Sequence, residues 1–254
     1  MQITIQTMKK RDTLLSILDF QQDSMSLFWK EQLFAAYPTL DKEKWLQVPF
    51  SLKQPYLTKS VSKIYDTLKK TLIEKKDLFK TRWQLYQEPI NSIFSDIFDI
   101  DCHNIYNNVI TEISLNPICP RYLKEQRFTV FYKYGPEQFL NTCIHELIHF
   151  VWFYKWQNHF KDNQTEYETP HLKWLLSEMV IDTLITNSDL KYFYKTLGNE
   201  RPAYSYFYNM KIQNVFLLEK LQELFLQSQN IIEFMNTSYQ YLIKNKNEIV
   251  KQIP

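Results

Sequence analysis

The spacing of hydrophobic residues divides the chain into an early helical stretch, a short β-rich middle and a helical remainder. In the charged segment 58–87, apolar side chains recur every three or four residues, which predicts a long amphipathic helix. Residues 2–6 alternate weakly, as a short strand does. Residues 109–115 (VITEISL) and 128–134 (FTVFYKY) are rich in β-branched and aromatic side chains, which favours two strands.

Two apolar helices are expected after these strands. The first begins at Pro136, because proline suits the first helical position, and it continues to about Trp156. Its apolar residues cover a wide arc, which predicts a buried helix. A polar stretch follows, and then Thr169-Pro170 is typical of an N-cap and first helical residue, so a second helix is expected through about Thr186.

These patterns predict an α+β fold that is predominantly helical, with a small β-sheet packed on the helix that begins at Pro136. Residues 1–100 are expected to form a helical N-terminal region. Residues 101–187 would form a core with the strands and both apolar helices, and 188–254 a helical C-terminal lobe. At 254 residues, these regions can form one compact unit.

Composition narrows the functional classes. With only two glycines, the chain has few positions for left-handed turns, which argues against a Gly-rich phosphate loop or a many-turned β-sandwich. The net charge is +2, and basic pairs such as Lys69-Lys70 and Lys75-Lys76 are interspersed with acids. This mixture is typical of a solvated helix face, so we expect no nucleic-acid partner.

The sequence gives no sign of secretion or membrane insertion. Its apolar runs are far shorter than the roughly 20 residues that span a bilayer, and the N-terminus MQITIQTMKKRD lacks an apolar signal region. Cys102, Cys119 and Cys143 are an odd number without CxxC spacing, as expected for reduced thiols. A cytoplasmic location is therefore expected.

The string HELIH at 145–149 indicates metal chemistry. On a helix, His145 and His149 point the same way one turn apart, so their imidazoles can bind one metal ion. Glu146 lies about 100° round the helix from His145, close enough to act on a metal-bound water. A catalytic zinc also needs a third protein ligand and one open position.

Glu178 and Asp182 are the leading candidates to complete the site. They lie four apart, so both carboxylates share one face of an otherwise apolar helix. Buried carboxylates there would need a cation or hydrogen-bond donors. Glu178 can be the third ligand, and Asp182 can accept the other ring N–H of a ligand histidine. The alternative is that both face solvent.

Other residues compete for the third position. His171 can replace Glu178, can line the cleft as a donor, or can be an exposed residue of the first helical turn. His159 follows His149 by ten residues but lacks the glycine turn of the HExxHxxGxxH pattern. Cys143 projects from nearly the opposite side of the helix to His145, which predicts a core position.

HELIH followed by S-E-M-V-I-D resembles the gluzincin group of zinc metallopeptidases, whose thermolysin-like pattern is HExxH…ExxxD. The resemblance covers about residues 109–187. It implies a zincin-like fold and a peptidase with one zinc ion that acts on peptides or proteins. Its implied zinc ligands are His145, His149 and Glu178. It also implies Glu146 as the general base and Asp182 as the support of a ligand histidine.

The resemblance also suggests how a substrate would be held. The segment ISLNP resembles the substrate-lining edge strand of compact zinc peptidases, so an extended peptide is expected to pair with an open edge at 109–115 or 128–134. Tyr204, Tyr206, Tyr208 and His171 are candidate donors to the oxyanion.

Two other functions compete with the peptidase. The chain can be a binding or regulatory protein on a metallopeptidase scaffold, although its retention of Glu146 argues against simple loss of catalysis. It can also be a metal hydrolase that acts on a non-peptide amide.

Overall fold

The computed structural model describes residues 1–106, 108–162, 164–195 and 201–253. The fold is α+β and predominantly helical, as the sequence predicts, with a small mixed sheet. Two compact units are formed from segments far apart in the chain. Unit 1 contains Met1, Tyr86–Asn107 and Leu140–Pro254, and unit 2 contains Gln2–Leu85 and Asn108–Phe139. This division cuts across the three consecutive regions that the sequence predicts.

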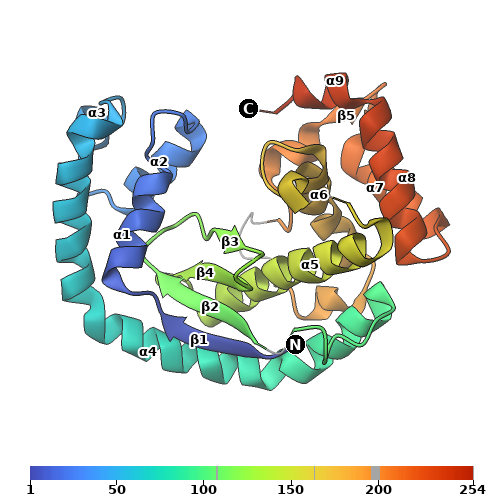
Figure 1. Cartoon of the computed structure of the whole chain (residues 1–254), viewed down its shortest axis with the longest axis horizontal. Helices are drawn as coiled ribbons and strands as arrows, with labels where there is room; N and C mark the ends of the chain where they lie inside the picture. Colours follow the sequence, from blue (N-terminus) through green and yellow to red (C-terminus); the bar gives the residue numbers. More distant parts are fainter. Residues whose placement is uncertain (107, 163, 196–200, 254) are drawn as a thin grey trace. The chain divides into compact units, whose positions relative to one another are not determined.

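Unit 2 contains a four-stranded sheet in the order β1-β2-β4-β3 (Figure 1). β2 pairs in parallel with both β1 and β4, and the short β3 pairs antiparallel with β4. The strands expected near residues 2–6, 109–115 and 128–134 are all confirmed. Their bounds are Ile3–Thr7 for β1, Val109–Ser114 for β2, Arg121–Tyr122 for β3 and Arg127–Phe131 for β4.

The expected open edge at 109–115 is wrong, and β3 covers only the start of the edge expected at 128–134, where Arg121 lies opposite Phe128. β2 and β4 are the two inner strands of the sheet, and β1 and β3 form its edges. The physical reason is a long-range pairing, in which Ile3 lies opposite Val109 and covers the free side of β2. The backbone groups of β2 are therefore already used in the sheet.

The helices of unit 2 are α1 (Lys10–Asp19), α2 (Leu27–Ala36), α3 (Lys42–Trp45) and α4 (Phe50–Phe98) as far as Leu85. α4 is longer than the helix predicted at 58–87. It continues through Pro55 and Pro89, although proline removes a backbone donor and usually interrupts a helix. In unit 2 the rings of Phe79 and Phe139 stack at 4.3 Å.

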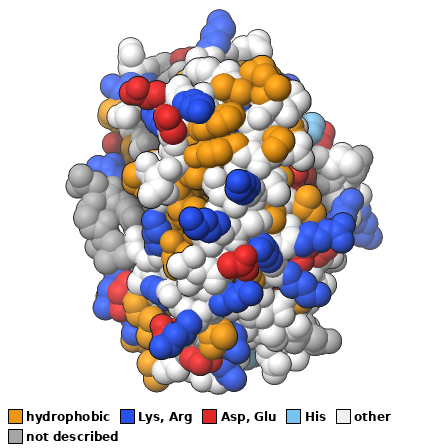
Figure 2. All heavy atoms as spheres, turned by 90° about the vertical axis from the view of Figure 1, so that its left-hand side faces the viewer, with side chains coloured by type: hydrophobic (Ala, Val, Ile, Leu, Met, Phe, Trp, Pro, Cys, Tyr) orange, Lys and Arg blue, Asp and Glu red, His pale blue; other side chains and the backbone are white. Residues whose placement is uncertain are grey.

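The outer face of α4 in unit 2 mixes lysines, acids and apolar side chains (Figure 2). Lys69 pairs with Asp66 at 3.3 Å and Lys70 with Glu74 at 3.8 Å. Because these cations have carboxylate partners on the same helix, the face resembles the solvated surface that its sequence predicts.

Unit 1 is a group of packed helices that includes most of α5 (Pro136–Phe160) together with α6 (Leu172–Thr186) and three later helices (Figure 1). The later helices are α7 (Leu217–Gln227), α8 (Ile231–Lys244) and α9 (Lys246–Val250). Three short 3-10 helices also belong to unit 1: η1 (Gln164–Tyr167), η2 (Asp189–Tyr192) and η3 (Ser205–Asn209). β5 (Lys211–Ile212) and β6 (Val215–Phe216) pair antiparallel. Within the described ranges, no helix has both the length and the apolarity needed to cross a bilayer.

The start of α5 follows from local chemistry. Pro136 is its first residue, as predicted, and the carbonyl of Gly135 accepts from the Phe139 N–H. The Gln138 side chain reaches back and accepts from the Gly135 N–H at 3.2 Å, which resembles one half of a capping box. The predicted start of α6 at Thr169-Pro170 is wrong, because His171 is the N-cap and Leu172 the first helical residue.

We predict that Phe79→Ala will lower the free energy of unfolding by about 3–5 kcal/mol, because it removes a fully buried ring that stacks on Phe139. Leu85→Ala on the same helix is the control, because Leu85 is 64% exposed and its loss should change stability by about 0.5 kcal/mol or less. Urea unfolding monitored by circular dichroism measures both values. Equal losses in the two variants would contradict this packing.

Candidate metal centre

Two helices of unit 1 bring three potential metal ligands together. His145 and His149 come from α5, and Glu178 comes from α6. Each residue offers one ligand atom, and these atoms all lie within 4.8 Å of one another. The histidines meet because a spacing of four places them on one side of a helix. The group can hold a metal ion.

The spacing of the ligand atoms suits a tetrahedral ion. The two histidine Nε2 atoms are 3.1 Å apart. One carboxylate oxygen of Glu178 lies 3.3 Å from His145 Nε2, and the other lies 3.3 Å from His149 Nε2. Ligands bound at about 2.0–2.2 Å to a tetrahedral centre lie about 3.3–3.6 Å from each other. The three contacts are near this range, and the two contacts to Glu178 involve its two different oxygens.

Burial makes this cluster costly without a cation. His149 is fully buried and Glu178 is 3% exposed. The side chain of His145 is 22% exposed and provides the solvent-facing side of the group. An ionised carboxylate in such surroundings is strongly disfavoured unless it is paired, so Glu178 needs a cation or hydrogen-bond donors beside it.

Hydrogen bonding alone does not account well for all three close contacts. When Glu178 is ionised, each Nε2 carries at most one proton, so two protons serve the contacts between the two imidazoles and from each imidazole to Glu178. If both protons point at the carboxylate, the two nitrogens face each other at 3.1 Å with no proton between them. A metal ion resolves this conflict because it accepts a lone pair from each group.

Glu146 lies within the HELIH helix and is 7% exposed. Burial raises the pKa of the neighbouring Cys143 thiol well above its ordinary value, and the negative charge of Glu146 adds to this effect. Cys143 is fully buried and does not belong to the ligand group, so it occupies the core position that the sequence predicts.

Asp182 has a different partner from the one expected. The sequence predicts that it accepts a ring N–H from a ligand histidine, but its carboxylate accepts from the Tyr208 hydroxyl at 2.5 Å. The Tyr208 oxygen also accepts from the Ala203 N–H at 3.3 Å. Asp182 therefore links α6 to η3, and its partner lies 26 residues further along the chain.

Among the three candidate tyrosines, Tyr206 is the one whose pKa is raised by the charge of Glu178. Burial raises the pKa of its hydroxyl above the usual range, and the charge of Glu178 raises it further. Tyr206 and Tyr208 are two residues apart in η3, while Glu178 and Asp182 are four apart in α6. The sequence favours none of the three tyrosines as the oxyanion donor. Only the packing of η3 against α6 distinguishes them.

The remaining histidine candidates lie outside the ligand group. His171 is exposed at the N-cap of α6, where its side chain makes no capping hydrogen bond. His159 is exposed in the last turn of α5, with its ring edge against Phe160. Neither joins the cluster of His145, His149 and Glu178.

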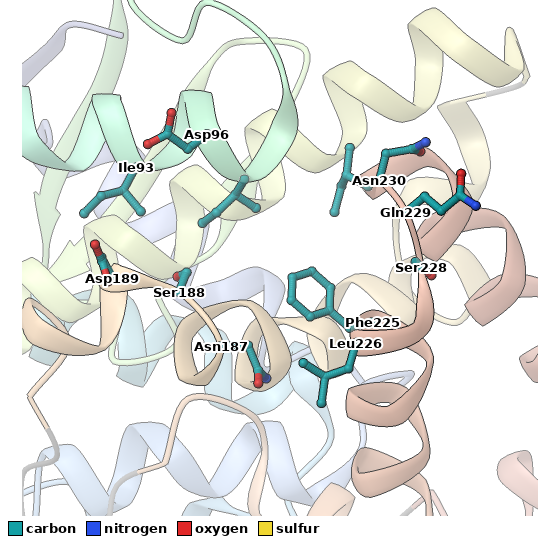
Figure 3. Close-up of a pocket in the computed structure, with 12 residues that line it drawn as sticks. Ile93, Asp96, Asn187, Ser188, Asp189, Phe225, Leu226, Ser228, Gln229 and Asn230 are labelled. Carbon is teal, nitrogen blue, oxygen red and sulfur yellow. The ribbon is translucent and has the colours of Figure 1, made fainter.

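A separate cavity of about 510 Å³ lies in unit 1 between helix ends (Figure 3). None of the three ligand residues lines it. Several of its polar side chains terminate helices: Asn187 donates to the Thr183 carbonyl, Ser228 donates to the Leu224 carbonyl, and Asn230 accepts from the Glu233 N–H. Because these groups already serve the helix ends, the cavity does not add to the metal chemistry.

No protein-family model, curated protein or solved structure matches this chain.

We predict that stability will fall as the pH rises above about 10, the ordinary pKa of tyrosine, because Tyr208 keeps its proton more tightly in the folded protein. Its contribution is complete below that pH and is lost as the pH approaches the raised pKa. In Tyr208→Phe, the slope of unfolding free energy against pH should be shallower by at most about 1.4 kcal/mol per pH unit.

The control is Tyr192→Phe, since Tyr192 is 70% exposed. Urea titrations from about pH 9 to about pH 11 measure both slopes. A slope in Tyr208→Phe equal to that of the wild type would show that burial and the bond to Asp182 do not raise the pKa of Tyr208 in the folded protein.

Proposed function

We propose that the protein is a zinc-dependent peptidase of the gluzincin type, with a zincin-like fold. The observation that carries this proposal is the meeting of His145, His149 and Glu178 at distances of 3.1–3.3 Å, from two separate helices. The sequence HELIH with a later glutamate is the gluzincin pattern, and the folded chain brings those residues together.

The donor set favours zinc among the common metals. Two imidazoles and one carboxylate are a ligand combination of catalytic zinc sites, whereas calcium and magnesium prefer sets of oxygen ligands. Three protein ligands also leave one position for water or substrate. The exposed side of His145 provides access from solvent.

The reaction requires a base and a donor besides the metal. When bound, zinc lowers the pKa of a coordinated water and polarises a carbonyl group. Glu146 would be the residue that accepts a proton from water and returns it to the leaving amine. Glu146 directly follows a ligand histidine in the sequence, and its burial restricts its contact with bulk water.

Tyr206 is the best candidate for the oxyanion donor. Burial and the charge of Glu178 raise the pKa of its hydroxyl, so the group stays protonated at neutral pH and can donate a hydrogen bond. Tyr208 is already committed to Asp182, which makes it a structural residue in this scheme.

The peptide substrate is inferred from the gluzincin resemblance. The inner position of β2 removes one of the two strand edges that the sequence offered for peptide pairing, and β3 covers the start of the other. The proposal therefore depends on the metal site, and a digest of a peptide library would establish the cleavage preference.

We predict one zinc ion per chain, with affinity that depends on Glu178 and not on His171. Glu178→Ala should weaken zinc binding by at least about 100-fold, because it removes a direct ligand. His171→Ala is the matched control and should bind zinc like the wild type. Competition with a chromophoric chelator measures these affinities. Loss of zinc in His171→Ala with full retention in Glu178→Ala would reverse the ligand assignment.

We predict that Glu146→Gln will retain zinc and lose hydrolysis by at least about 100-fold, because the amide keeps the shape of the side chain but cannot accept the proton. Cleavage of a fluorogenic peptide library and metal content are measured on the same preparation. A wild-type protein that binds zinc but cleaves no peptide would refute the peptidase and favour a binding protein or another amide hydrolase.

A further inference from the structure

The third ligand lies far along the chain from the first two. Glu178 follows His149 by 29 residues, and the segment between them contains the end of α5, the linker 161–171 and the first turns of α6. A linker of this length does not by itself fix how two helices lie against each other. The structure shows side chains in this linker that contact both helices.

The linker is tied to α6 through a nearly buried lysine. Lys173 lies in the first turn of α6 with a side chain only 9% exposed. Its ammonium group pairs with Asp162 at 2.5 Å and with Glu166. Burial alone would lower the pKa of Lys173, but the hydrogen bonds from its ammonium group to the two carboxylates raise it, so the cation persists.

The same carboxylate is tied back to α5. Asp162 accepts from the Trp156 indole N–H at 2.8 Å and from the Tyr167 hydroxyl at 2.6 Å. Burial alone would raise the pKa of Asp162, yet the hydrogen bonds from Lys173, Tyr167 and Trp156 lower it. The carboxylate therefore stays ionised and connects the end of α5 with the start of α6.

An aromatic stack leads from the linker to a ligand. Tyr167 is 3% exposed, and its ring stacks on Phe153 with centroids 4.3 Å apart. Phe153 lies one helical turn after His149, and the two rings are nearly parallel with centroids 6.4 Å apart. The linker thus packs behind the imidazole of His149 as well as holding the helix that carries Glu178.

We infer that Asp162, Glu166, Tyr167 and Lys173, here called the linker brace, position Glu178 against the two histidines and so set the metal affinity without touching the metal. This inference rests on the proposed zinc site. A shift of α6 by one residue would move Glu178 by about 1.5 Å and rotate it by about 100°. Metal ligands tolerate displacements of only about 0.2 Å, so the brace is a positioning device for the third ligand.

The test uses four variants of the whole chain. Lys173→Met leaves the Asp162 carboxylate without its cation, and Tyr167→Phe removes the hydroxyl that reaches Asp162 and the Gln157 side chain of α5. The double variant Asp162→Asn with Lys173→Met removes both charges, so it leaves no unpaired buried ion and should fold even if the single variant does not. Lys173→Arg keeps the charge and should restore binding.

Zinc affinity and the visible spectrum of the cobalt(II)-loaded protein are the two measurements. We expect Lys173→Met and the double variant to bind zinc about 10- to 100-fold more weakly, the range found for residues that orient metal ligands, and Tyr167→Phe to lose less. The cobalt bands should change in shape, which a loss of stability alone would not cause because they report ligand geometry. Lys220→Met is the control, since it removes an ion pair within α7 that links no two helices.

The outcomes separate the two claims. If the wild type binds no zinc, the proposed function fails, and the inference fails with it. If the wild type binds one zinc ion and every brace variant that folds binds it with the same affinity and cobalt spectrum, the zinc site stands and the brace is refuted. Weaker binding with altered cobalt bands, reversed in Lys173→Arg, supports it.

Discussion

A buried carboxylate is the constraint on which the candidate site depends. Glu178 is 3% exposed on an apolar helix, and its two oxygens lie 3.3 Å from two imidazoles of another helix. An ionised carboxylate in such a place is stable only beside positive charge. Two histidines can supply that charge with a proton, but a metal ion supplies it while also resolving the contact between the imidazoles. The packing of α5 against α6 therefore depends on a partner for the Glu178 carboxylate.

The surroundings of the cluster divide into groups with different tasks. Glu146 is adjacent in the chain to the ligand candidate His145 and is mostly shielded from solvent, and proton transfer is its proposed role. Tyr206 is held protonated near Glu178, whereas Tyr208 is bonded to Asp182 and joins η3 to α6. Two tyrosines in one short 3-10 helix therefore differ in role because they face two carboxylates one turn apart.

Local patterns predicted the parts of the structure that depend on local chemistry. The start of α5 at Pro136, the strand at Val109 and the pairing of His145 with His149 all follow from residues close together in the chain. The choice of Glu178 needed one further idea, that a carboxylate on an apolar helix must have a partner. This idea applies equally to Asp182, but Asp182 found a tyrosine hydroxyl instead of a histidine.

The failures involve contacts that local patterns do not encode. β2 is an inner strand because Ile3 pairs beside Val109, more than a hundred residues away. α6 begins at Leu172 with His171 as its N-cap, whereas Pro170 had favoured an N-cap at Thr169. The sequence contains one sign of the linker brace. This sign is a lysine in the first turn of an apolar helix that follows an acidic linker.

The central claim is that His145, His149 and Glu178 bind one metal ion. The most direct measurement is a crystal structure of the zinc-saturated protein with anomalous data at the zinc edge. The account predicts a single anomalous peak about 2.0–2.2 Å from both Nε2 atoms and from a Glu178 oxygen. A zinc-saturated crystal with no peak at this position, or with zinc held only by other residues, would contradict it.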